Sequence, residues 1–127
     1  IHALAEGADI VVAPEENWCV NVDNILAAVT DKTRIVAVAN PNNPTGTYIP
    51  ESEIRRLHAG LPSNIILMLD GAYADYVMKD DFNDGLSLVK EFSNVMVTRT
   101  FSKLYGILFY CNFRQKKGWT RSRLQSF

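Results

Sequence analysis

The sequence lacks the features that mark several classes of protein. No run of apolar residues approaches the roughly twenty that a membrane-spanning helix needs. There is no low-complexity segment and no internal repeat beyond an alternation of strand-like and helix-like segments. We therefore expect neither a membrane span nor a repeat architecture.

Cysteine and histidine are too sparse for a metal site, with two of each among 127 residues. Cys19 and Cys111 do not have metal-ligand spacing and are typical of free thiols in a reducing compartment. We expect Cys19 to be a small packing residue, and both His2 and His58 to lie on the surface. The sequence thus predicts no metal ligand and a cytoplasmic location.

A strong excess of charge of one sign is also missing. Lys and Arg total 13 and Asp and Glu total 14, which gives a net charge of −1 at pH 7. Proteins that bind nucleic acid or anionic membranes usually carry a basic excess, so the sequence predicts neither partner. With 47% hydrophobic residues, the composition is that of a soluble globular protein whose length suits one domain.

Three short apolar runs are what the sequence does have. They are rich in Val, Ile and Leu and begin about thirty residues apart, which is typical of parallel strands buried on both faces and joined by crossover helices. The runs lie at 35–39, 65–69 and 95–98, and polar motifs follow them at 40–46, 70–73 and 99–103. In such sheets ligands bind outside the carboxyl ends of the strands. We therefore expect an asparagine, an aspartate, a tyrosine and a lysine to converge on one crevice.

The rest of the chain fits an α/β fold with a mostly parallel sheet and flanking helices. Residues 9–13 predict a further strand. Helices are expected at 24–29, with Asp23 as the N-cap, at 51–60 and at 87–92.

The three polar motifs resemble the signature segments of one enzyme family. Asn-Pro-Asn-Asn-Pro-Thr-Gly at 40–46, Asp-Gly-Ala-Tyr at 70–73 and Thr-Phe-Ser-Lys at 100–103 are similar, in order and spacing, to those of fold-type-I pyridoxal-phosphate-dependent aminotransferases. Within that group, the sequence of residues 99–106 most resembles that of histidinol-phosphate aminotransferases. The resemblance covers residues 1–106 and implies part of the large domain of that fold.

The resemblance implies a role for each polar residue of these motifs. Lys103 would carry pyridoxal 5'-phosphate (PLP) as a Schiff base and then move the α-proton of the substrate. Asp70 would face the pyridine nitrogen and keep it protonated, which strengthens electron withdrawal by the ring. Tyr73 and Asn43 would hydrogen-bond the phenolic oxygen of the ring. Lys103, Asp70 and Tyr73 are therefore the expected catalytic residues.

Two hydroxyl residues precede the lysine, and Thr100 and Ser102 would offer their hydroxyls to the cofactor phosphate. The segment could instead be a Ser-Xaa-Xaa-Lys acyl-enzyme motif. That interpretation fails because Thr100, not a serine, stands three residues before Lys103, and no Lys-Thr-Gly or Ser-Asp-Asn segment follows.

Each motif alone also has a plainer interpretation. The segment 43–46 could be only a tight turn, Asp70 could cap the next helix, and Tyr73 could be an aromatic residue at the edge of the core. The three motifs together, in this order, favour the cofactor site.

The function implied by the resemblance is PLP-dependent transfer of an amino group from histidinol phosphate to a 2-oxo acid such as 2-oxoglutarate, in histidine biosynthesis. The alternatives are another class I or II amino acid aminotransferase, a related phosphoamino-acid decarboxylase or, in a different class, a catalytically inert fragment. The resemblance also implies a homodimer whose partners are a small-molecule amino donor and a 2-oxo acid. It places the substrate-binding arginine beyond residue 127 and the ring-stacking aromatic residue before residue 1.

Residues 107–127 depart from the family pattern. They hold five Lys or Arg residues and no acid, whereas residues 1–106 hold eight basic and fourteen acidic residues. Cys111 stands eight positions after Lys103, where the family pattern has the arginine that binds the cofactor phosphate. We expect 1–106 to be a partial PLP-binding domain and 107–127 to be out-of-frame translation. A genuinely divergent basic terminus that binds a partner is the alternative.

Overall fold

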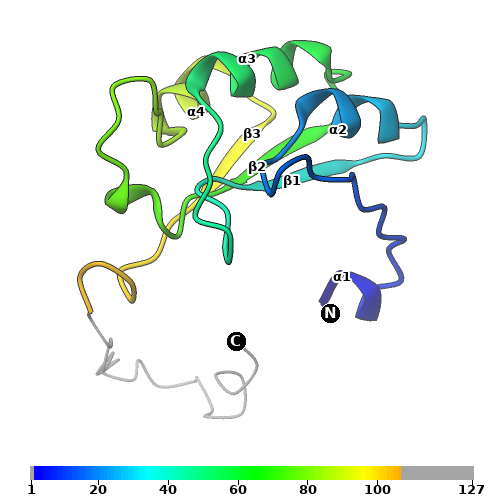
Figure 1. The fold of residues 1–127 in the computed structure, drawn as a ribbon. Helices are drawn as coiled ribbons and strands as arrows, with labels where there is room; N and C mark the ends of the chain where they lie inside the picture. Colours follow the sequence, from blue (N-terminus) through cyan, green and yellow to red (C-terminus); the bar gives the residue numbers. More distant parts are fainter. Residues whose placement is uncertain (1, 107–127) are drawn as a thin grey trace, which may run out of the picture.

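The structure is a computed structural model that describes residues 2–106 (Figure 1). Along these residues, four α-helices, one 3₁₀-helix and three strands follow one another in the order α1 (His2–Ala5), α2 (Val22–Ala28), β1 (Ile35–Ala39), α3 (Glu51–Gly60), β2 (Ile66–Asp70), η1 (Ala74–Tyr76), α4 (Leu86–Glu91) and β3 (Val95–Thr98). None of the helices described is long and apolar enough to cross a membrane.

The three apolar runs form a parallel sheet in the order β1-β2-β3, with β2 at its centre. The register pairs Ala39 with Asp70 and Asp70 with Thr98, so the three strands end level with one another. The predicted α/β fold with parallel strands and intervening helices is therefore confirmed.

The core lies on one face of this sheet, where α2, α3 and α4 all pack (Figure 1). Alternate residues of the central strand point to it, and Leu67 and Leu69 are buried there. They meet Ile54 and Leu57 from α3 and Leu88 from α4, which are also buried. Apolar burial of this kind is the main force that holds the helices on the sheet.

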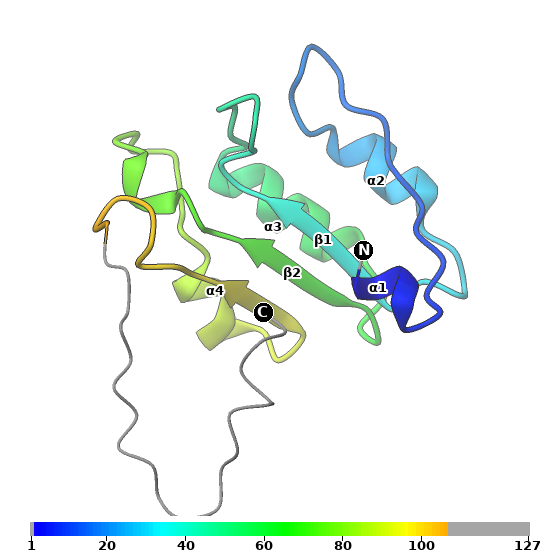
Figure 2. The same cartoon turned by 90° about the horizontal axis from the view of Figure 1, so that it is seen from below.

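Within residues 2–106 the strands are buried on one face only, whereas the apolar runs predict burial on both. Ile35, Ile66 and Met96 point to the other face and are 56%, 42% and 43% exposed. The helices α2, α3 and α4 all lie on the opposite side of the sheet, and the short α1 lies on the exposed side but apart from the strands (Figure 1 and Figure 2). Ile35, Ile66 and Met96 therefore stay open to solvent within residues 2–106. An unbroken apolar run indicates that a strand can be buried on both sides. It does not indicate which segment of the protein covers each side.

The predicted strand at 9–13 is also absent, because these residues are irregular. Ile10, Val11 and Val12 are 52%, 71% and 81% exposed, and the segment pairs with none of the three strands. β-Propensity expresses how well a side chain fits a pleated, partly buried surface. A segment without a neighbouring strand therefore gains nothing from it.

The predicted helices are close to those observed. The helix predicted at 51–60 is α3 itself, and α4 starts and ends one residue earlier than expected. Helix α2 begins at Val22, and its N-cap is Asn21 rather than Asp23, because Asn21 Oδ1 accepts a hydrogen bond of 3.0 Å from the backbone N–H of Asn24.

The surface position predicted for His58 was wrong. This side chain is half-buried, its Nε2 lies 2.9 Å from Asn94 Oδ1, and its ring stacks on Phe92 with a centroid separation of 3.9 Å. Cys19 is a half-buried free thiol, in agreement with a packing role, and Cys111 lies outside the described residues.

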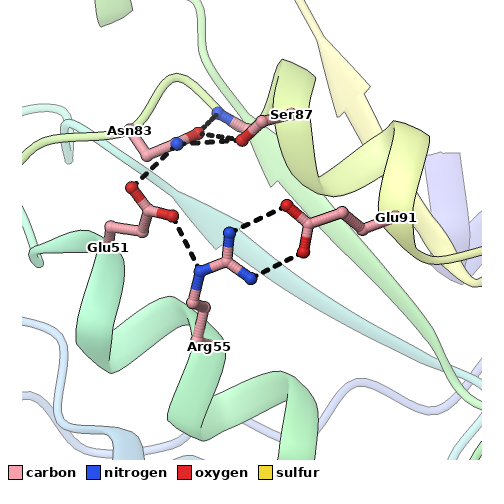
Figure 3. A network of polar contacts seen from close by, with 6 residues as sticks. Glu51, Arg55, Asn83, Ser87 and Glu91 are labelled. Carbon is pink, nitrogen blue, oxygen red and sulfur yellow. Dashed lines mark hydrogen bonds and ion pairs between the residues drawn. The ribbon is translucent and has the colours of Figure 1, made fainter.

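A polar network joins α3 to α4 (Figure 3). Arg55 binds Glu91 through both terminal nitrogens, at 2.7 and 2.9 Å, while its Nε donates to Glu51 at 2.7 Å. Asn83 donates to Glu51 at 2.9 Å and contacts Ser87 on α4. The network therefore fixes the helix that leads into β3.

The network predicts an acid dependence of stability. A hydrogen bond from Arg55 lowers the pKa of Glu91 from its usual 4.5, and hydrogen bonds from Asn83 and then Arg55 lower that of Glu51. A carboxyl whose pKa is lower in the folded state stabilises the fold above its unfolded pKa and loses this effect as pH falls through the folded pKa. We expect the Tm of an Arg55→Met variant to fall less between about pH 6 and about pH 3 than that of the unsubstituted protein.

The control is Arg34→Met, because the Arg34 guanidinium donates to backbone carbonyls of Asp31 and Thr33. Its Tm should follow the unsubstituted protein through the acid range. Parallel curves for Arg55→Met and the unsubstituted protein would show that the network has no pH-dependent role.

Candidate active site

The three polar motifs leave the same end of the sheet (Figure 2). The backbone continues the strand pairing past the strand ends, because the N–H of Asn40 donates to the carbonyl of Asp70 at 3.0 Å and that of Gly71 to the carbonyl of Thr98 at 2.9 Å. The predicted convergence of the three motifs at the carboxyl edge is therefore present in the fold.

The first motif is a loop whose base is closed by one side chain. Asn40 is 5% exposed, its Oδ1 accepts from the backbone N–H of Ile49 at 2.9 Å, and its Nδ2 donates to the carbonyl of the same residue at 3.0 Å. The loop turns at Gly46, whose φ of +71° suits glycine and whose N–H donates to the carbonyl of Asn42 at 2.8 Å. The tight-turn interpretation of 43–46 is thus correct, and it is compatible with a site role for Asn43.

Three of the predicted site residues lie together, one from each motif. Asn43 Nδ2 donates to the Tyr73 hydroxyl at 3.3 Å. The Lys103 Nζ lies over the Tyr73 ring, 5.4 Å from its centroid, at a distance typical of a cation–π contact. Tyr73 therefore links the lysine to the asparagine.

Asp70 lies at the end of the central strand with one carboxylate oxygen held. Its Oδ1 accepts from the backbone N–H of Ala72 and from the Thr98 hydroxyl, both at 3.1 Å. Within residues 2–106, its Oδ2 has no hydrogen-bond partner. The carboxylate is thereby oriented and still has one oxygen free. The helix-cap interpretation was wrong, because the N-cap of η1 is Tyr73.

Thr100 and Ser102 form a hydroxyl pair just before the lysine. Their Oγ1 and Oγ atoms are 2.8 Å apart, and the backbone N–H of Ser102 donates to Thr100 Oγ1 at 3.1 Å. The turn is closed by a bond of 3.1 Å from the N–H of Gly106 to the carbonyl of Lys103. The two hydroxyls contact each other, and no bond joins them to Asp70 or Tyr73.

An open pocket of about 370 Å³ lies beside this group. Asn43 and Tyr73 line it, whereas Asp70, Thr100, Ser102 and Lys103 do not. The remaining lining comes from Pro41, Asn42, Pro44, Gly46, Tyr76 and Val77. Tyr76 and Val77 were missed by the sequence reasoning, and their only signal was their position after the Asp-Gly-Ala-Tyr motif.

Arg99 was also missed, although it adjoins the lysine motif. Its guanidinium forms ion pairs with Asp75 in η1 and, at 3.0 Å, with Asp84 before α4. Burial lowers the pKa of Arg99, but the two carboxylates outweigh burial and raise it above its usual value. Within residues 2–106, no group of three or more His, Cys, Asp or Glu side chains could hold a metal ion.

We expect Asn40 to be more important for stability than Asn42, whose side chain is half-buried and makes only an exposed hydrogen bond. An Asn40→Ala substitution leaves a buried N–H and a buried carbonyl without partners, at a cost of about 2–4 kcal/mol in the free energy of unfolding. Asn42→Ala is the matched control, since Asn42 makes an exposed bond to Glu15 and its loss should cost less than about 0.5 kcal/mol. Urea unfolding measures both, and equal losses would contradict the role of Asn40.

Comparison with known proteins defines the class of this chain. The family model for aminotransferase class I and II matches residues 2–108, and the chain belongs to that family. The fold agrees with this assignment. It is a parallel sheet with helices, and the three motifs meet at the carboxyl edge of the sheet.

The individual relatives that the chain resembles are histidinol-phosphate aminotransferases. The chain is 58% identical over 107 residues to a histidinol-phosphate aminotransferase of Rhodopseudomonas palustris (strain TIE-1), covering 84% of this chain and 29% of the relative. It is 56% identical to that of Rhodospirillum centenum, covering 84% and 30%. The crystal structure of histidinol-phosphate aminotransferase from Sinorhizobium meliloti in complex with pyridoxal-5'-phosphate has a TM-score of 0.76 and 33% identity, covering 84% of this chain and 29% of that one. The chain thus spans about 29% of the length of these relatives.

Proposed function

We propose that residues 1–106 form part of the PLP-binding domain of an aminotransferase that moves an amino group from histidinol phosphate to a 2-oxo acid such as 2-oxoglutarate. The observation that carries the proposal is the meeting of the three motifs, in which Lys103 lies over the ring of Tyr73 and Tyr73 is bonded to Asn43. The names of the relatives support the choice of amino donor.

The described residues fit PLP. Lys103 is exposed and makes no ion pair within residues 2–106, so its amine is free to bond to the aldehyde of the cofactor. The free Oδ2 of Asp70 suits a protonated ring nitrogen. The hydroxyl pair of Thr100 and Ser102 suits a phosphate group.

PLP, when bound, supplies an electron sink for the bonds at the α-carbon of an amino acid. Lys103 would hold the cofactor through its Nζ, and the same amine would take and return the α-proton of the substrate. Asp70 would keep a proton on the ring nitrogen, because a nearby negative charge favours the protonated form. Tyr73 Oη and Asn43 Nδ2, which are bonded to each other, would hold the phenolic oxygen of the ring.

Other features of the whole protein are part of the same proposal. We propose a homodimer located in the cytoplasm. A different class I or II amino acid aminotransferase, or a related decarboxylase, would use the same residues, because none of these side chains selects the amino donor. Turnover with histidinol phosphate, compared with aspartate or an aromatic amino acid as the donor, distinguishes these substrates.

The inert alternative applies to the 127 residues on their own. It is supported by the exposed sheet face of Ile35, Ile66 and Met96, and by a span of 29% of the relatives' length. Exposed apolar patches of this kind promote association.

Lys103→Ala tests the proposal in a host chimaera, in which residues 2–106 replace the corresponding segment of the full-length Rhodopseudomonas palustris (strain TIE-1) relative. We expect the lysine–PLP bond, trapped with borohydride and measured by mass spectrometry, to disappear. Turnover should fall by at least about 10²–10⁴-fold, the usual contribution of one positioned proton-transfer group. Lys79→Ala, at an exposed lysine, is the control. Near-normal turnover of Lys103→Ala would remove this residue from the mechanism.

We also propose the boundary near residue 106, with 107–127 translated out of frame. These residues lie outside the described part of the chain, and the support is that the family match ends at residue 108. The nucleotide sequence across codons 104–112 is the test. We expect a single-base shift to restore a run of small and apolar residues that ends in arginine, and failure to find one would favour a divergent terminus.

A further inference from the structure

Arg99 lies where the two halves of the proposed site meet. One half is the turn after β2, which carries Asp70 and Tyr73, and the other is the turn after β3, which carries Lys103. Arg99 directly follows β3 and reaches back to Asp75 in η1, two residues beyond Tyr73. Its second ion pair, with Asp84, reaches the segment before α4, where Asp84 also accepts from the N–H of Leu86 at 3.0 Å.

The stem of Arg99 is fitted against the first turn. A Cβ atom added at Gly71 would lie 3.1 Å from Arg99 Cδ and 3.2 Å from the carbonyl oxygen of Thr98. Gly71 also donates its N–H to that carbonyl at 2.9 Å. Glycine at this position therefore allows the arginine to cross the end of β2 between Asp70 and Tyr73.

The guanidinium makes a contact that few side chains could replace. Its Nη1 and Nη2 bind two different carboxylates, which the planar fork of arginine allows and the single ammonium of lysine does not reproduce. Its side chain is 28% exposed, against 39% for Arg55 and 43% for Arg56, the other ion-paired arginines of residues 2–106. Solvent therefore screens its ion pairs less than theirs.

The ion-pair partners of Arg99 lie in a different part of the fold from those of Arg55 and Arg56. Arg55 joins α3 to α4, and Arg56 joins Asp23 to Glu53 on the helices. Both pairs fix helices on the covered face of the sheet. Arg99 alone among these three joins one site turn to the other.

We propose that Arg99 is a positioning residue: through Asp75 and Asp84 it holds the turn that carries Lys103 at a fixed distance from Asp70 and Tyr73. It acts through these residues and does not touch the reacting atoms. This inference rests on the proposed function, since it needs Lys103 to bond to PLP. A misplacement of about 1 Å at a reacting group can lower a rate by about a hundredfold.

The test uses Arg99→Lys, Arg99→Met, Asp75→Asn and Asp84→Asn in the host chimaera. Three quantities are measured: the fraction of Lys103 trapped by borohydride at saturating PLP, kcat and KM for histidinol phosphate, and Tm. We expect both Arg99 variants to lower the trapped fraction and to lower kcat by about 10–100-fold, with KM changed less than kcat. Asp75→Asn should have a larger effect than Asp84→Asn, because Asp75 is in the turn of Tyr73.

Arg56→Met is the matched control, since Arg56 also binds two carboxylates, away from the site. It should lower Tm without changing the trapped fraction or kcat. If Arg99→Met does not fold, Asp75→Asn and Asp84→Asn provide the test of the inference. Each removes one of the two ion pairs of Arg99 and leaves the arginine in place.

Two results would overturn the inference. One is a trapped fraction and a kcat at the unsubstituted level in the folded Arg99→Lys, Asp75→Asn and Asp84→Asn variants. The other is a host chimaera that forms no lysine–PLP bond, which overturns the proposed function as well. If the chimaera forms the bond and Lys103→Ala loses it, the proposed function stands, and the Arg99 variants then decide on the role of Arg99 alone.

Discussion

The parallel pairing of β2 with both neighbouring strands is the constraint on which the rest of the structure depends. Because the pairing is in register to the strand ends, the N–H of Asn40 reaches Asp70, and the N–H of Gly71 reaches Thr98. Residues separated by about thirty positions are thereby brought side by side through backbone bonds alone. The side chains of the site therefore start close together and can contact one another.

Much of this arrangement could be predicted from the sequence, because it follows from local patterns. Apolar runs rich in β-branched residues identify the strands, and the helix at 51–60 is bounded by Pro50 and Gly60. The order of strand and polar motif places Asn43, Tyr73 and Lys103 at one edge. Their proximity in the structure agrees with that prediction.

What could not be predicted depends on contacts between distant residues. Residues 9–13 have the composition of a strand, but only a neighbour would have made them one. The ion pairs of Arg99 join it to residues fifteen and twenty-four positions away, and no spacing rule marks such partners. The two hydrogen bonds between Asn40 and Ile49 are likewise contacts that no sequence pattern predicts.

The closure of the loop by Asn40 has a consequence for ligand binding. A loop that orders only around its ligand loses conformational entropy at that moment, and affinity is reduced by the same amount. Here two hydrogen bonds to Ile49 fix the base of the loop, so Asn42 and Asn43 are held in the pocket wall without a ligand. The conformational entropy of this wall is lost when the chain folds and not when a ligand binds. A ligand that enters the pocket therefore meets a surface already in place.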